Sequence, residues 1–331
     1  MPARLSLLRA ALIIALVAAS GHRAAALVVA PPASNNNITA PVDDPGWLNV
    51  GDRGVYLGNR WVLTVSHVGA GATFFPGVGS FAYETGTSVR LANPTGLGLT
   101  TLTDLVLYRL TTAPNLPSLT ISTGTPAVNA QVTLIGDGRA VAPTATETEW
   151  FVTGSGTNYT WTEVAPGNGN ALGYKSTASV KLWGTNLVED DVPFFSQVDP
   201  DHNVNVNSGS GDVISFFTEF DKTGITGGLT TNSESQALGG DSGSGVFAKN
   251  GANWELAGIT HAIGVFEDQP GFQTPTPSGP QTAVYGDLTY IADLFAYRDQ
   301  ILTITAVPEL GSFLLVGAFA AIAGARRVIR R

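Results

Sequence analysis

Three short segments of the sequence could bring a histidine, an aspartate and a serine together for nucleophilic catalysis. His67 ends the run Trp61-Val62-Leu63-Thr64-Val65-Ser66-His67, and Asp104 heads the run Asp104-Leu105-Val106-Leu107. Ser242 lies in the glycine-dense run Gly239-Gly240-Asp241-Ser242-Gly243. A serine hydroxyl needs a neighbouring base to become a nucleophile. Imidazole suits that task because its unperturbed pKa is about 6.5, and a carboxylate can fix its tautomer.

Each segment alone has an ordinary structural explanation. His67 could be a satisfied histidine at a strand end, Asp104 a turn or cap residue, and the Gly-Asp-Ser-Gly run a flexible loop. The three together, in the order His, Asp, Ser and each beside its own strand, favour a catalytic triad. That order differs from the Ser-Asp-His of the α/β-hydrolases and the Asp-His-Ser of the subtilisins.

The elements that must position these residues are mostly strands. Short apolar runs rich in Val, Ile, Thr and aromatic residues alternate with Gly, Asn, Pro and Asp, which is typical of strands and turns. The predicted strands are 54–57, 61–65, 105–110, 131–135, 150–153, 159–164, 213–220, 245–248 and 255–259. Gly58-Asn59-Arg60 predicts a hairpin turn between the first two. A period near 3.6 predicts a helix over 288–301.

These segments resemble the trypsin/chymotrypsin-like serine proteases over about residues 47–301. Leu63-Thr64-Val65-Ser66-His67 is similar to the family's Leu-Thr-Ala-Ala-His block, and Gly240-Asp241-Ser242-Gly243 reproduces its nucleophile motif. Val132-Thr133-Leu134-Ile135-Gly136 resembles the strand that opens the second barrel, and Tyr285 to Ile301 the closing strand and C-terminal helix.

The resemblance implies a fold and a set of roles. The fold would be all-β, with two antiparallel six-stranded barrels at about 45–125 and 126–301 and a C-terminal helix. The composition of 110–127, with Thr, Pro and Ser in excess, makes this run the candidate linker between the two halves. Ser242 would be the nucleophile, His67 the base and then the acid, and Asp104 the orienting group. The backbone N–H groups of Gly240 and Ser242 would stabilise the oxyanion. Neither a cofactor nor a metal is needed, and the substrate would be a protein or peptide.

The resemblance also implies which residues would form the substrate pocket. Gln236, six residues before the nucleophile, should lie at the base of the substrate pocket, where a preference for Lys or Arg would need aspartate. Thr260 and His261 match the strand that lines this pocket. His261 is either a polar wall residue or, with a one-residue slip in register, an imidazole that could select acidic side chains. In many relatives an Arg-Ile-Val-Gly-Gly activation site precedes the first barrel, and the N-terminus freed there pairs with the aspartate that corresponds to Asp241. No such site precedes the first barrel in this sequence.

Both ends of the chain read as targeting segments. Residues 1–26 combine arginines, an apolar run and a final Ala24-Ala25-Ala26, which predicts a secretory signal peptide. Residues 307–331 contain Val307-Pro308-Glu309, an apolar stretch and a terminal arginine cluster, and resemble the PEP-CTERM sorting signal of Gram-negative bacteria. That resemblance implies an exosortase-type processing enzyme and a transient anchor in the membrane, and a plain membrane anchor is the alternative. We therefore expect residues 27–306 to work as an exported domain, extracellular or at the cell surface.

The composition supports a folded body and excludes one class of partner. The chain has 331 residues, 44% hydrophobic and 13% charged, with no cysteine, so its core must hold by packing alone. Residues 27–306 carry 10 basic and 25 acidic residues. Binding to nucleic acid depends on Lys and Arg that neutralise phosphates, so nucleic acid is not an expected partner.

Two other functions remain open from the sequence alone. One is a catalytically silent, protease-like protein that binds at a surface or matrix, although an intact triad argues against it. The other is an esterase without proteolytic activity. The oxygen-rich run Asp199-Pro200-Asp201-His202-Asn203 has the look of a calcium loop, but Val204 stands where an EF-hand has glycine, so a solvated turn is favoured.

Overall fold

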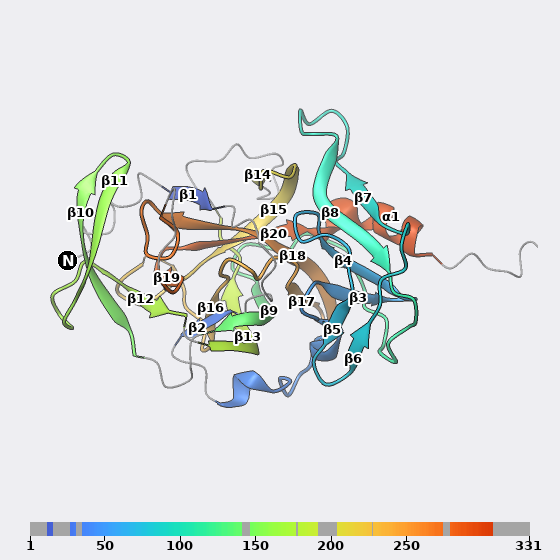
Figure 1. Cartoon of the computed structure of the whole chain (residues 1–331), viewed down its shortest axis with the longest axis horizontal. Coiled ribbons are helices and arrows are strands. Elements are labelled where there is room, and N and C mark those ends of the chain that lie inside the picture. The colour runs from blue at the N-terminus through green and yellow to red at the C-terminus, as the bar shows by residue number, and fades with distance from the viewer. Residues whose placement is uncertain are drawn as a thin grey trace, which may run out of the picture. The chain divides into compact units, whose positions relative to one another are not determined.

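The computed structural model describes residues 12–15, 27–30, 35–140, 146–176, 178–190, 204–226, 228–273 and 279–306. Strands are the main secondary structure of this part of the chain, and one α-helix ends it (Figure 1). The predicted all-β class with a C-terminal helix is therefore confirmed. Residues 1–11 and 16–26 of the predicted signal peptide, the run 199–203 and the predicted sorting segment 307–331 lie outside the described residues.

The first half of the chain forms a small barrel of six strands. These are β3 (Val55–Gly58), β4 (Trp61–Val65), β5 (Thr73–Phe75), β6 (Gly79–Phe81), β7 (Val89–Ala92) and β8 (Leu102–Arg109). Four of them pair in the order β3-β4-β8-β7, and β5 pairs with β6. Asp52 N donates to Phe74 O at 2.9 Å, and Tyr83 bridges to Leu110, so the two sheets join at both ends.

The hairpin between β3 and β4 forms where the sequence predicts it. Val55 lies opposite Leu63, and the turn residues Asn59 and Arg60 both have positive φ, 51° and 71°. A hairpin turn needs this left-handed backbone, which asparagine tolerates better than most residues. The turn leads the chain into β4, whose end carries His67.

The second half forms a larger barrel. Its six strands are β9 (Gln131–Ala140), β13 (Ala178–Leu187), β15 (Asp212–Glu219), β17 (Gly245–Asn250), β18 (Asn253–Phe266) and β20 (Leu288–Asp293). They pair in the order β15-β20-β18-β17-β9-β13. The path closes because Glu189 N donates to Phe217 O at 3.1 Å and Asn186 Nδ2 to Glu219 O at 2.9 Å. The expected pair of six-stranded barrels is therefore present.

Further elements extend the second barrel. A separate sheet runs β11-β10-β12-β19, and the large sheet gains edge strands at both ends and along β18. The added strands are β1 (Leu12–Ala15), β2 (Val28–Ala30), β10 (Thr148–Ser155), β11 (Asn158–Val164), β12 (Ala171–Lys175), β14 (Val204–Asn207), β16 (Glu234–Gln236) and β19 (Thr282–Val284). Two short 3₁₀ helices, η3 (Asn35–Ile38) and η4 (Trp47–Asn49), precede the first barrel.

The predicted helix over 288–301 is partly wrong. Residues Leu288–Asp293 are strand β20, and the helix α1 is Leu294–Thr305. β20 pairs with β15 on one edge and β18 on the other, and all six of its residues are buried. A strand that is buried along its whole length has no strict alternation of apolar and polar residues. The apolar residues of β20 therefore matched a helical period as well as a strand period.

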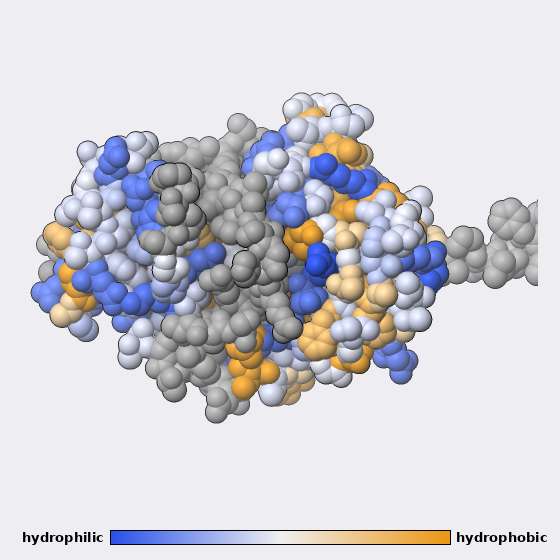
Figure 2. All heavy atoms as spheres, viewed as in Figure 1, coloured by the Kyte–Doolittle hydropathy of each residue, from blue (hydrophilic) through white to orange (hydrophobic). Residues whose placement is uncertain are grey.

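Packing holds the two barrels without disulfides, as the absence of cysteine requires. The larger core includes Leu134, Phe216, Val246 and Ile291, all at most 1% exposed. On the face drawn in Figure 2, apolar surface occurs as several separate patches between polar ones. Among the described residues, those up to Arg298 belong to one compact unit and residues 299–306 to a second. The domain boundaries at 26 and 306 stay predictions, and in the described part of the chain no helix is long and apolar enough to cross a membrane.

Candidate active site

The structure brings His67, Asp104 and Ser242 into one line of hydrogen bonds. His67 Nδ1 lies 2.7 Å from Asp104 Oδ2, and His67 Nε2 lies 2.8 Å from Ser242 Oγ. The Asp104 carboxyl is fully buried, whereas the His67 side chain is 10% exposed and Ser242 is partly exposed. The arrangement can pass a proton from the serine hydroxyl to an imidazole that a carboxylate orients.

Strand register in the first barrel places the histidine against the aspartate. β4 pairs with β8 so that Val65 lies opposite Leu105, which puts the next residues of β4 beside Asp104. Ser66 N donates to the Asp104 carbonyl at 2.7 Å and continues the ladder past the end of the strand. His67 therefore follows directly from where β4 ends.

The carboxyl of Asp104 receives four hydrogen bonds. Oδ1 accepts from Ser66 Oγ at 2.7 Å and from His67 N at 3.1 Å, and Oδ2 contacts His67 Nδ1 and accepts from Ser208 Oγ at 2.6 Å. Burial alone would raise the pKa of Asp104, but these bonds from His67, Ser208 and Ser66 lower it below its usual value. Asp104 is thus held as a carboxylate although no solvent reaches it.

Two of these partners were not predicted from the sequence. Ser66 lies in the segment Leu63–His67, and its position directly before His67 was the sequence signal that could have identified it. Ser208 is 1% exposed and follows β14 in the chain, a hundred residues beyond Asp104. No motif marks Ser208, because its role depends on how the segment before β15 packs against the first barrel.

The turn that carries Ser242 is attached to β18 and to the first barrel. Gly243 N donates to Thr260 O at 2.8 Å, and Thr260 N donates to Ser244 O at 3.0 Å. Gly243 has φ +92°, and a Cβ on it would lie 2.8 Å from Thr64 Oγ1 and 2.9 Å from Arg53 O. Only glycine fits this backbone and this close approach of the two barrels.

The same turn presents two backbone N–H groups. Gly240 has φ +109°. The amides of Asp241, Gly243 and Ser244 donate to backbone carbonyls. Within the described part of the chain, the amides of Gly240 and Ser242 donate to no protein group. They are the two predicted oxyanion donors. Because the amides of Asp241 and Gly243 are engaged and those of Gly240 and Ser242 are not, the latter two are available to a developing negative charge.

Asp241 is a second fully buried carboxyl, next to the nucleophile in sequence. Its Oδ2 accepts from Leu238 N at 2.7 Å, while its Oδ1 has no hydrogen-bond partner among the described residues. Burial raises the pKa of Asp241 well above its usual range, and nearby Asp137 raises it further. A Cβ at Gly136 would lie 2.9 Å from that Oδ1 and 3.3 Å from Leu27 Cγ, so the buried Leu27 side chain lies beside Asp241.

The structure buries all three predicted pocket residues. Gln236 Nε2 donates to Leu288 O at 2.9 Å, and Gln236 Oε1 accepts from Thr289 Oγ1 at 3.0 Å. Thr260 contacts the nucleophile turn through its backbone, as described above. His261 is 1% exposed, and its Nε2 lies 2.8 Å from Ser215 Oγ. Burial lowers the pKa of His261 to about 4, so it is neutral at neutral pH.

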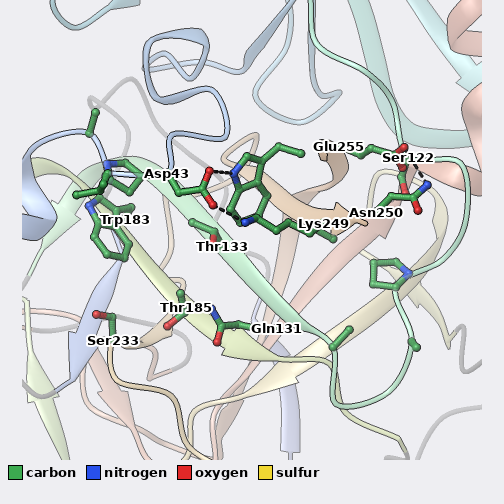
Figure 3. A pocket seen from close by; sticks show the side chains of 18 of the residues that line it. Asp43, Ser122, Gln131, Thr133, Trp183, Thr185, Ser233, Lys249, Asn250 and Glu255 are labelled. Carbon is green, nitrogen blue, oxygen red and sulfur yellow. Dashed lines mark hydrogen bonds and ion pairs between the residues drawn. The ribbon is translucent and has the colours of Figure 1, made fainter. Parts of the chain in front are cut away.

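A large hollow in the described part of the molecule lies away from the triad. It has a volume of about 1370 Å³, and its walls include Asp43, Trp183, Lys249 and Trp254 but none of the three triad residues (Figure 3). Its polar groups largely satisfy one another: Trp183 Nε1 donates to Thr39 O at 3.0 Å, and Trp254 Nε1 to Asp43 Oδ1 at 2.9 Å. Nothing in this hollow resembles a reactive group. In the described residues, no three His, Cys, Asp or Glu side chains cluster as a metal site.

Comparison with known proteins gives structural matches only. No protein-family model and no curated protein matches the sequence. Solved structures similar to this chain include neuropsin, a serine protease from mouse brain, with 13% identity over 82% of this chain and 98% of that one, and a TM-score of 0.41. The NS6 protease of murine norovirus matches with 15% identity over 77% and 93% of the two chains, and a TM-score of 0.35. Human heparin binding protein matches with 12% identity over 76% and 82%, and a TM-score of 0.35.

Proposed function

We propose that this chain is a serine endopeptidase that hydrolyses peptide bonds through an acyl-enzyme. The observation that carries the proposal is the line Asp104–His67–Ser242, with contacts of 2.7 and 2.8 Å. A fold alone would not support it, because one fold can host many functions. The geometry of these three side chains is what acyl transfer by serine requires.

In the proposed reaction, Ser242 Oγ attacks the scissile carbonyl carbon while His67 Nε2 takes the hydroxyl proton. The carbonyl oxygen becomes an oxyanion beside the amides of Gly240 and Ser242, and His67 then gives its proton to the leaving amine. Water, deprotonated by His67, attacks the acyl-enzyme in the same way and releases the acid. Asp104 stays ionised throughout and stabilises the imidazolium.

The proposed substrates are peptides without a strong preference for Lys or Arg. Gln236 is neutral, and both ends of its amide are engaged with Leu288 and Thr289. A pocket that selects cationic side chains would need a carboxylate at its base. The acidic-specificity alternative through His261 gains no support from a buried imidazole bonded to Ser215.

Export belongs to the proposal on the strength of the sequence. The basic and apolar residues 1–26 support secretion, and the Val307-Pro308-Glu309 tail supports sorting by an exosortase-type enzyme with a transient membrane anchor. On this proposal the barrels act outside the cytoplasm of a Gram-negative bacterium, at the surface or beyond it.

The test is covalent labelling of the folded full-length chain with a fluorophosphonate probe. We expect the wild type to be labelled at Ser242, Ser242→Ala to show no labelling, and His67→Ala to be labelled at least about 10²-fold more slowly. Ser80→Ala, at an exposed serine, is the matched control and should label like the wild type. A folded wild type that stays unlabelled, or a labelled Ser242→Ala variant, would contradict the proposal.

A further inference from the structure

The hairpin formed by β14 and β15 carries Ser208 in its turn (Figure 1). The two strands pair as far as Asn207 opposite Asp212, and residues 208–211 connect them. From this turn, Ser208 Oγ donates to Asp104 Oδ2 at 2.6 Å. Turns are more mobile than the strands that they connect, so other contacts must hold this one if the bond to Asp104 is to persist.

Asp212 closes the turn and joins it to the first barrel. Its Oδ1 accepts from Asn207 Nδ2 at 2.8 Å, across the base of the turn. Its Oδ2 accepts from Thr100 N at 2.7 Å, and its own backbone N donates to Thr100 Oγ1 at 2.7 Å. Burial acts to raise the pKa of Asp212, but the hydrogen bonds from Thr100 and Asn207 lower it below its usual value. Asp212 is therefore a carboxylate at neutral pH, and its hydrogen bonds are charge-assisted.

The backbone of the turn also lies directly against the strand that carries Asp104. Gly211 has φ +129°, and a Cβ on it would clash with Leu102 O of β8. Only glycine allows this backbone and this close approach. Gly211 immediately precedes Asp212, so two adjacent residues attach the hairpin to the first barrel.

A buried asparagine supports the same attachment. Asn93 is 8% exposed, and its Nδ2 donates to Thr100 O at 2.8 Å and to Asp212 O at 2.9 Å. Tyr297 OH, from α1, donates to Asn93 Oδ1 at 2.7 Å and accepts from Ile214 N at 2.9 Å. The chain before β8, the base of the hairpin and the helix thus share one network of hydrogen bonds.

We propose that Asp212 is a positioning residue, which holds the turn so that the Ser208 hydroxyl stays bonded to Asp104. Asp212 acts on the catalytic carboxylate through Ser208. Its effect on the reaction rests on the proposed function, whereas its effect on the position of Ser208 does not. Without the Asp212 carboxylate the turn loses its bonds to Asn207 Nδ2 and Thr100 N, and the buried Asp104 carboxylate then loses the donor that the turn supplies.

The first experiment is a double-mutant cycle on the full chain, with Asp212→Ala, Ser208→Ala and the double variant. Each single change should lower kcat for peptide hydrolysis by about tenfold with KM little changed. If Asp212 acts through Ser208, the double variant should lie within about twofold of Ser208→Ala. An unchanged kcat in Asp212→Ala would overturn the proposal. Losses that multiply to about a hundredfold would overturn it too, because Asp212 would then act independently of Ser208.

Glu149→Ala is the matched control. Glu149, on β10, accepts from Gly167 N and Gly169 N at 2.9 Å and so also holds a turn, the one between β11 and β12. It should keep the wild-type kcat, and an equal loss in this control would overturn the proposal. If Asp212→Ala does not fold, Asn207→Ala replaces it in the cycle, because it removes the bond across the base of the turn and leaves Asp212 attached to the first barrel. It should show the same lack of additivity with Ser208→Ala.

An NMR measurement keeps the positioning testable if the chain proves inactive. The proton between His67 Nδ1 and Asp104 Oδ2 should move to lower field when the Ser208 donor is lost, because the carboxylate becomes a stronger acceptor for the remaining bond. We expect Asp212→Ala and Ser208→Ala to move this signal equally and Glu149→Ala to leave it in place. A wild-type signal in Asp212→Ala would overturn the positioning. Unlabelled, inactive chains that show the two equal shifts would contradict the proposed function and support the positioning.

Discussion

The candidate site contains two fully buried aspartates, Asp104 and Asp241, which differ in the number of hydrogen bonds that their carboxyl groups accept. Asp104 belongs to the first barrel, and its carboxyl receives four hydrogen bonds. Asp241 belongs to the second barrel, and its carboxyl accepts one, from Leu238 N. The pKa of Asp104 is lowered and that of Asp241 is raised well above its usual range, although burial acts on both in the same direction.

The difference shows how strongly hydrogen-bond donors affect the charge of a buried carboxyl. Burial disfavours the ionised form by removing water, and only hydrogen bonds or nearby cations can restore it. Asp104 has those donors and can stabilise a charged imidazole. Asp241 has a single donor, Leu238 N, so its carboxyl destabilises the folded state at neutral pH.

The largest effect should follow from Asp104→Asn. An asparagine cannot hold His67 in the tautomer that accepts the Ser242 proton, so we expect kcat for peptide hydrolysis to fall by about 10⁴-fold. Steady-state kinetics and the rate of fluorophosphonate labelling measure the loss. A decrease of less than about tenfold would mean that Asp104 does not orient the base.

Gly243→Ala should slow labelling and destabilise the fold. The new Cβ would meet Thr64 Oγ1 at 2.8 Å and Arg53 O at 2.9 Å, and the residue would keep φ +92°. We expect the free energy of unfolding to fall by about 1–3 kcal/mol. Gly251→Ala is the control, because Gly251 also has positive φ (+61°) but nothing lies within 4 Å of its Cβ position. Equal losses in the two variants in urea unfolding would show that contact with the first barrel is unimportant.

Ser208→Ala tests whether the fourth bond to Asp104 matters. Loss of the hydroxyl donor at 2.6 Å leaves Oδ2 with His67 alone, which weakens the ionised form of Asp104. We expect kcat to fall by about tenfold with KM little changed. Ser210→Ala, on the same segment, should behave as the wild type. A change confined to KM would instead place Ser208 in substrate binding.

Asp241→Asn should stabilise the full chain, whereas Asp104→Asn should destabilise it. The raised pKa of Asp241 means that its stabilising contribution is present below its usual pKa and lost as pH rises toward the folded value. Asp104, with a lowered pKa, contributes stability that is present above its usual pKa and lost as pH falls through the folded value. At pH 7 we expect Tm to rise by about 2 °C or more for Asp241→Asn and to fall for Asp104→Asn. If thermal unfolding shows Tm changing in the same direction in both variants, the two aspartates do not contribute to stability in opposite ways.

Glu234→Gln extends the comparison to a third buried carboxyl, with the smallest effect. Burial raises the pKa of Glu234 from 4.5 to about 8, against hydrogen bonds from Thr231 and Asp221. Its stability contribution is therefore present below pH 4.5 and lost as pH rises through about 8. We expect the variant to lose less stability than the wild type between pH 5 and 8, as followed by Tm.

The sequence predicts the triad and the strands around it because their signals are local. His67 follows the end of a strand, Asp104 lies at the head of an alternating run, and Ser242 lies among glycines that the turn requires. The barrel strands that were predicted are short and bounded by turn residues. For these residues, local chemistry and the final fold agree.

The remainder depends on contacts that no local pattern records. Ser208 reaches Asp104 only because a distant segment packs beside it, and β20 looks helical because it is buried on both edges. The environment of His261 depends on an irregular pairing between β18 and β20 at Thr260 and Ala262. Register irregularities of this kind change which way a side chain points, and sequence alone does not reveal them.

The pairing of β4 with β8 has a consequence for how this protein can be altered. His67 and Asp104 are held by the ladder between the two strands, and the residues from 68 to 101 make the excursion between them. A residue inserted into either strand would turn the imidazole and the carboxylate to opposite faces, whereas the exposed turn at 94–98, between β7 and β8, can gain or lose residues while the ladder stays in step. That turn is therefore where added residues would leave proton transfer undisturbed.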